Sequence, residues 1–242
     1  MQPKEIHPYV DKFPLTKAYK YLVIGTFPPA EKLGPNRIRK FSIDYFYGNV
    51  ASFWNIIKKI YPNYIFSVVE HIQGWQEDYS VGITDTIISC RRKKQESTSD
   101  SDLLIEWDDY NHKLKNYILD NLNYIEKLIF TSGINCNNAL FNFKIIMGDD
   151  FKKVIDKIFN LPSPSNGSNR SYFNMNKNTL GLEGGFYNFV INNTDEKTRL
   201  FIQNSFKIKS SGVSDTKVKR IPDGILSKYK LYMYEKVFPR NR

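Results

Sequence analysis

An apolar run that stops abruptly is the feature that most constrains the fold. Residues 21–24 read Tyr-Leu-Val-Ile, and Gly-Thr-Phe-Pro-Pro follows at 25–29. An unbroken apolar run of this length, bounded by Gly and Pro, is typical of a strand buried on both faces of a parallel sheet. Pro28 and Pro29 fix their φ angles and remove two backbone donors, so the turn resists collapse. Because ligands bind at the carboxyl edge of open α/β sheets, we expect a site at this turn.

The rest of the chain alternates between further candidate strands and helices. Residues 125–133 form a second apolar run that ends at a glycine, and 157–161 lead into a second proline-containing turn. Helices are predicted at 50–61, 108–123 and 225–238, and another follows the run at 125–133 with Asn135 or Asn137 as its N-cap. This order predicts an α/β fold with a doubly wound parallel sheet. We expect a single domain over 1–242, with an elaboration at about 172–224 that includes a helix near 195–206.

Two segments between these elements are less determinate. Residues 64–72 fit either a strand or a buried helix. Residues 79–90 form an apolar stretch that carries one acid, Asp85. Burying a carboxylate is costly unless it is hydrogen-bonded. Asp85 therefore either serves a function or satisfies backbone donors.

The charge balance favours a polyanionic partner. Lys and Arg number 35 against 25 acids, for a net charge of +10. Neutralising phosphates with such charges releases counterions and drives binding to nucleic acid, although a merely basic composition would look the same. The two cysteines have no metal-ligand spacing, so neither a metal site nor a disulfide framework is expected. No apolar run reaches transmembrane length, which predicts a soluble, cytoplasmic protein without membrane contact.

Two polar loops are candidates for contact with a nucleic-acid backbone. The first, 91–102, begins Arg-Arg-Lys-Lys and continues into a polar Ser/Asp-rich stretch, which also fits a flexible surface loop. The second, 162–171, starts with Pro-Ser-Pro-Ser and ends near Arg170. It could bring hydroxyl and amide donors to a phosphodiester, or it could be an ordinary surface loop.

Three stretches resemble the uracil-DNA glycosylase superfamily and occur in its order. The Gly-Thr-Phe-Pro-Pro turn, followed by Phe-Tyr-Gly-Asn at 46–49 and Phe-Trp at 53–54, resembles the first motif of the mismatch-specific and hypoxanthine-type branches. Gly-Ile-Thr-Asp-Thr at 82–86, with the Ser/Asp-rich loop after it, is similar to their middle segment. Leu-Pro-Ser-Pro-Ser-Asn-Gly-Ser-Asn-Arg at 161–170 is similar to the loop that these enzymes insert into the DNA minor groove.

The resemblance implies a three-layer α/β/α fold with a central four-stranded, mainly parallel sheet. It also implies a monofunctional DNA glycosylase that flips a damaged or modified base from DNA and hydrolyses its N-glycosidic bond, leaving an abasic site. No cofactor or metal is expected, and the partner is double- or single-stranded DNA bound by a monomer. The implied base pocket consists of Gly25, Thr26, Phe27, Pro28 and Tyr47, with Tyr47 as the stacking ring. The implied DNA contacts are Ser163, Pro164, Ser165, Asn166, Ser168, Asn169 and Arg170, together with Arg91, Arg92 and Lys93 of the first loop.

The chain departs from the family where the chemistry is usually placed. Phe27 stands where relatives carry an acid or amide that directs water. Ala51 and Leu161 stand where branches carry Asn and His. The remaining catalytic candidates are Asp44, Asn49 and Asp85. We rank Asp44 first, because an ionised Asp can orient water and stabilise a cationic sugar, although each candidate could instead be structural.

Three questions stay open at this point. The excised base could be uracil, hypoxanthine or a modified pyrimidine, and the role could be base repair or defence against modified phage DNA. The alternative function is a non-catalytic DNA-binding protein that has kept the glycosylase fold. A metal-dependent nuclease ranks below both, because its candidate acids lie in a loop and at a helix start.

Overall fold

The computed structural model describes most of the chain. The described residues are 3–30, 32–34, 37–38, 42–48, 52–94, 96–132, 136–165, 189, 192–197, 199–200 and 223–239. The expected elaboration at 172–224 lies almost entirely outside them, and so does most of the helix expected near 195–206. Within the described ranges, none of the helices has the length and apolar character needed to cross a membrane.

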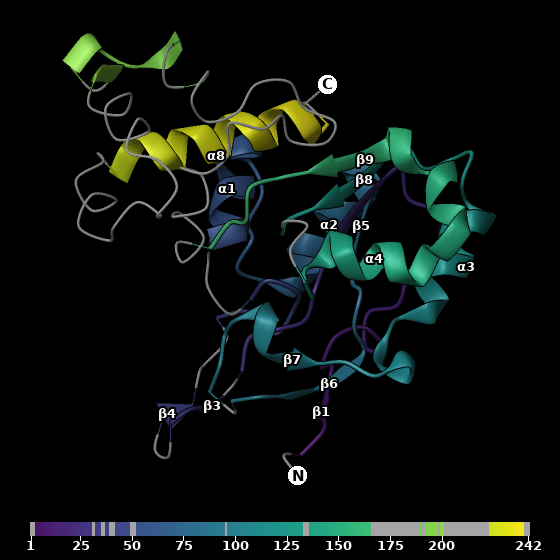
Figure 1. The fold of residues 1–242 in the computed structure, drawn as a ribbon. Coiled ribbons are helices and arrows are strands. Elements are labelled where there is room, and N and C mark those ends of the chain that lie inside the picture. Colours follow the sequence, from purple (N-terminus) through teal and green to yellow (C-terminus); the bar gives the residue numbers. More distant parts are fainter. Residues whose placement is uncertain are drawn as a thin grey trace.

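A four-stranded parallel sheet forms the centre of the molecule (Figure 1). Its strand order is β5-β2-β8-β9, with β5 at Val81–Asp85, β2 at Tyr21–Gly25, β8 at Lys127–Phe130 and β9 at Ile158–Asn160. The run at 21–24 is therefore a central strand, as its continuous apolar sequence predicts. All three pairings are parallel, so the four carboxyl ends meet at one edge.

Helices cover both faces of this sheet (Figure 1). Val23, Ile83 and Ile129 point to one face, where they join a core with α1 (Ser52–Ile60), α2 (Val69–Tyr79) and α8 (Asp223–Val237). The alternate strand residues, such as Leu22 and Phe130, face α3 (His112–Asp120) and α4 (Ala139–Met147). Because successive strand side chains alternate between faces, apolar runs build both cores at once. The predicted three-layer α/β/α arrangement is confirmed.

The predicted helix positions hold to within a few residues, with three exceptions. The segment at 64–72, which the sequence left undecided, is a turn that enters α2. The prediction at 108–123 is divided into a 3₁₀ turn, η2 (Trp107–Asp109), and α3. The N-cap residue of α4 is Asn138; of the two expected caps, Asn137 has a left-handed φ of 64° and Asn135 lies outside the described residues. Two further 3₁₀ turns, η3 (Gly148–Lys153) and η4 (Ile155–Lys157), connect α4 to β9.

A second sheet is built from short strands at the two ends of the polar segment 91–102 and from the start of the chain. It has the order β1-β6-β7, with β1 at Glu5–Ile6, β6 at Ser89–Arg92 and β7 at Leu103–Leu104. Both pairings are antiparallel, and a 3₁₀ turn, η1 (Asp100–Asp102), precedes β7. Between β6 and η1, residues 93–94 and 96–99 are in neither a helix nor a strand, so most of the polar segment 91–102 is a loop whose ends are held in this sheet; its contact with nucleic acid stays a prediction. A short hairpin, β3 (Lys32–Gly34) and β4 (Arg37–Ile38), lies in the basic stretch after the first proline turn.

Candidate functional site

Four residues meet on the α1/α8 side of the carboxyl edge, namely Gly25, Asp85, Thr131 and Tyr47. Gly25 ends β2 and pairs with Asp85, which ends β5. Thr131 directly follows β8, and its hydroxyl lies 2.8 Å from the hydroxyl of Tyr47. A Cβ built on Gly25 would lie 2.2 Å from Asp85 Oδ1 and 2.9 Å from the Tyr47 hydroxyl oxygen. The missing side chain of Gly25 is therefore what lets a carboxylate and a phenol converge over the end of β2.

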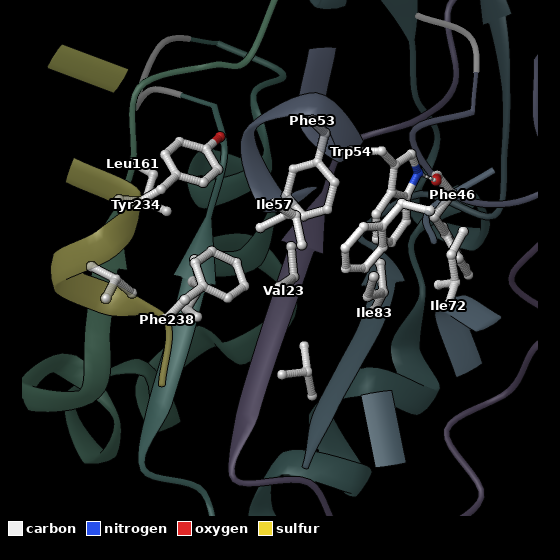
Figure 2. Close-up of a cluster of buried hydrophobic side chains, with 14 of the residues drawn as sticks. Val23, Phe46, Phe53, Trp54, Ile57, Ile72, Ile83, Leu161, Tyr234 and Phe238 are labelled. Atoms are coloured by element: carbon white, nitrogen blue, oxygen red, sulfur yellow. Dashed lines mark hydrogen bonds between the residues drawn. The ribbon is translucent and has the colours of Figure 1, made fainter. Parts of the chain in front are cut away.

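The ring of Tyr47 is fixed by the turn that carries it. Tyr47 has φ of 58°, a left-handed conformation that side chains rarely adopt, and such conformations concentrate at functional sites. In the same turn the Trp54 indole N–H donates to the Phe46 carbonyl at 2.9 Å (Figure 2). The Tyr47 ring is half-buried and stacks on Phe53 at 4.3 Å between centroids. Burial raises the pKa of the Tyr47 hydroxyl, and the charges of Asp85 and Asp100 raise it further.

Asp85 is buried, and His7 holds it. The Oδ2 atom of Asp85 lies 2.8 Å from His7 Nε2. His7 Nδ1 accepts the backbone N–H groups of Tyr9 and Val10 at 3.0 and 3.2 Å, so the ring proton is on Nε2 and is donated to Asp85. His7 thus has an orienting role, and Oδ1 of Asp85 is the oxygen that faces Gly25 and Tyr47.

A second carboxyl group, Asp100, reaches the same edge from η1. Its Oδ2 accepts the Thr26 hydroxyl at 3.0 Å, and Thr26 Oγ1 also lies 3.3 Å from Ser132 Oγ. Burial raises the pKa of Asp100 to about 7; the charge of Asp85 raises it, whereas the Thr26 hydrogen bond and Arg92 lower it. Nothing in the sequence marks Asp100 as a site residue, because one Asp in a Ser/Asp-rich stretch carries no signal of a partner 74 residues away.

Phe27 stands at the motif position where the resembling family carries a water-directing residue, but its side chain packs in a small apolar core. Its ring is buried among Ile87, Cys90 and Leu103 and meets the edge of the His7 ring at 5.2 Å. A hydrophobic contact thus occupies the position at which the resembling family carries an acid or amide.

Arg92, one of the predicted DNA contacts, is buried inside the protein. Only 2 % of the residue is exposed, and its guanidinium donates to the Glu5 carboxylate and to the carbonyls of Ser97 and Pro28. Because these partners occupy it inside the protein, it cannot reach a phosphate, and the prediction for Arg92 was wrong. Arg91 is half-buried and pairs with Glu106 at 2.8 Å, and Lys93 is exposed.

Asp44 lies at the surface of the protein. The side chain of Asp44 is 70 % exposed and pairs with Lys12 at the surface. Asn49 lies outside the described residues. Of the carboxylates considered from the sequence, Asp85 is the one that the structure brings to Gly25 and Tyr47.

The second proline turn follows β9, which β8 alone separates from β2 in the sheet. Helix α8 supports this turn: the Tyr234 hydroxyl donates to the Pro162 carbonyl at 3.1 Å. The buried Lys230 ammonium donates to the carbonyls of Pro164 and Ser165, and burial lowers its pKa to about 8. Tyr234 also lies near Phe53, 6.2 Å between centroids, with Leu161 beside it (Figure 2).

The supported turn includes three of the expected DNA contacts, Ser163, Pro164 and Ser165. Ser163 is half-buried and Ser165 is exposed. The predicted DNA contacts Asn166, Ser168, Asn169 and Arg170 lie outside the described residues.

No cluster of three or more His, Cys, Asp or Glu side chains suited to a metal ion occurs in the described part of the chain. Comparisons of this chain with protein-family models, with curated proteins and with solved structures found no match.

Proposed function

We propose that this protein is a DNA glycosylase that everts a damaged or modified base and hydrolyses its N-glycosidic bond. The observation that carries the proposal is the convergence of Asp85 Oδ1 and the Tyr47 hydroxyl over Gly25. Two proline-containing turns follow β2 and β9 at this edge, with only β8 between the two strands. The resemblance of 25–29 and 161–165 to glycosylase motifs requires such turns on the same edge. The net charge of +10 favours a DNA partner.

The reaction needs groups of the types found here. As the glycosidic bond breaks, the sugar becomes oxocarbenium-like and the base takes the bonding electron pair. A carboxylate near the sugar stabilises the positive charge and orients the attacking water. We assign this role to Asp85, in place of the motif position now held by Phe27, because the His7 N–H fixes one carboxylate oxygen and leaves Oδ1 directed at the site. The half-buried ring of Tyr47 provides the aromatic contact for the base.

A release assay tests this proposal. Duplexes that contain uracil, hypoxanthine or 5-hydroxymethylcytosine are incubated with the protein, abasic sites are detected by alkali cleavage, and the freed base is identified by mass. Asp85→Asn should slow release from the accepted substrate by about a hundredfold or more, while its dissociation constant for DNA stays within about threefold. Asp120→Asn is the matched control, since this exposed residue ends α3 and precedes the amino end of β8.

The same assay distinguishes the second candidate, a DNA-binding protein without catalysis. The observation in its favour is that Phe27 packs into a small core where relatives of the resembling family carry a water-directing residue. Tight binding with no abasic sites on any of the substrates would support that candidate and overturn the glycosylase proposal. Release that Asp85→Asn leaves unchanged would retain the activity but remove Asp85 from it.

A further inference from the structure

We infer that Asp100 is the acid that donates a proton to the departing base. The site then uses two carboxyl groups, with Asp100 as the acid and Asp85 as the group that stabilises the sugar and orients water. This inference rests on the proposed glycosylase function and extends it. Asp100 and Asp85 reach the carboxyl edge from different elements, η1 and β5, and each is held by a different partner.

The position of Asp100 is set by its ties to the first proline turn. Its carboxylate binds the hydroxyl of Thr26, the residue directly after Gly25. Backbone pairing of Arg92 with Leu103 closes the segment that carries Asp100, and the Arg92 guanidinium donates to the carbonyl of Pro28. The carboxyl group is therefore fixed to the same turn that approaches Tyr47 and Asp85.

A chain of hydroxyl groups lets Asp100 exist with or without its proton. The backbone N–H of Ala139 at the start of α4 donates to Ser132 Oγ, which contacts Thr26 Oγ1, which in turn contacts Asp100. Each hydroxyl can rotate to donate in either direction. Thr26 can thus donate to an ionised Asp100 or accept from a protonated one, so that loss of the proton need not break the contact.

The surroundings of Asp100 differ from those of Asp85 in a way that suits an acid. The charged and titratable groups facing Asp100 are Asp85 from β5, Arg92 and Cys90 from β6, and Tyr47 from the turn before α1. Burial and Asp85 outweigh Arg92 and the Thr26 hydrogen bond, and the pKa of Asp100 rises to about 7. Asp85 instead accepts the N–H of His7. Two carboxyl groups in unlike surroundings are the usual arrangement for separating an acid from a charge-stabilising group.

The proposed step balances without a co-reactant other than water. The N-glycosidic bond breaks, its electron pair passes to the base, and Asp100 donates its proton to that base. The water oxygen then bonds to the sugar carbon and releases one proton to Asp85, from which it passes to solvent. Asp100 regains a proton from solvent, so each turnover consumes one water and yields the protonated base and an abasic site.

The test is the pH profile of base release under single-turnover conditions, on whichever base the wild-type protein frees. The wild-type rate should fall about tenfold per pH unit above pH 7, because the acid is then ionised. Asp100→Asn should be about a hundredfold slower at pH 6.5, with unchanged DNA affinity and no decline of this kind above pH 7. Asp100→Glu should recover part of the rate together with the alkaline decline. Asp108→Asn, which removes an exposed negative charge from nearby in the sequence, should behave as wild type.

The outcomes separate the two proposals. A wild-type protein that frees none of the bases overturns the glycosylase function and this inference with it. Normal release by Asp100→Asn, or a slow rate that keeps the wild-type pH profile, overturns the acid role of Asp100 alone. A slow rate that Asp100→Glu fails to improve assigns Asp100 a purely structural role.

Discussion

Replacing Asp100 with asparagine should make the protein more stable above neutral pH. The folded protein raises the pKa of this carboxyl group from its usual 3.8 to about 7. Between these values the folded state binds more protons than the unfolded state, so the free energy of unfolding falls as the pH rises through this window. Asparagine has the shape of a protonated Asp and cannot ionise. The variant therefore avoids the loss.

The size of the effect follows from the shift. Three pKa units at about 1.4 kcal/mol each give about 4 kcal/mol. Partial exposure of Asp100 lowers the expected gain to roughly 2–4 kcal/mol at pH 8. At pH 4, where Asp100 is protonated in the folded state, the difference between Asp100→Asn and wild type should be close to zero.

Urea unfolding at pH 4 and pH 8 measures both differences, and it requires no DNA. A shift of the midpoint at an unchanged m-value reports a change in stability alone. The exposed Asp108→Asn serves as the control and should show no gain that depends on pH. Equal or lower stability of Asp100→Asn at pH 8, or a difference that is the same at both pH values, would refute the reasoning about the surroundings of Asp100.

Two further predictions concern the turn at residues 25–29 and its supports. Gly25→Ala places a methyl group 2.2 Å from Asp85 Oδ1, so it should lower the free energy of unfolding by about 1–3 kcal/mol in urea unfolding. It should also reduce the rate of base release at least about a hundredfold. Release at the wild-type rate would show that the close approach of Asp85 and Tyr47 to Gly25 is not needed. Arg92→Met should lower the free energy of unfolding by about 3 kcal/mol, since it leaves Glu5 and the Pro28 carbonyl without a buried donor. The variant should leave the salt dependence of DNA binding unchanged. A weaker dependence of DNA affinity on salt concentration would show that Arg92 contacts a phosphate after all.

The central layer could be predicted from the sequence because its strands are buried on both faces. Residues 21–24 and the run at 125–133 read as continuous apolar segments ended by glycine, a local signal that does not depend on distant residues. The second sheet gave no such signal. Its longest strand, β6, is four residues long and includes Arg91 and Arg92, whose burial or exposure depends on partners such as Glu5.

The candidate site was predictable only in part for the same reason. An acid in an apolar run marked Asp85 as unusual, but its partner His7 is 78 residues away. Asp100 meets Thr26 over a similar separation. Side-chain pairs of this kind are set by how strands are ordered in the sheet, and the spacing of residue types along the chain does not contain that order.

Helix α8 determines when, during synthesis of the chain, the turn at residues 162–165 gains its support. Lys230 and Tyr234 donate to the carbonyls of Pro162, Pro164 and Ser165, although all four strands of the central sheet are complete by residue 160. A growing chain on the ribosome can thus assemble its sheet while this turn still lacks its anchor. This turn gains its support only after residues 223–239 have been made, so a partly made chain would have its central sheet before this part of the carboxyl edge is fixed.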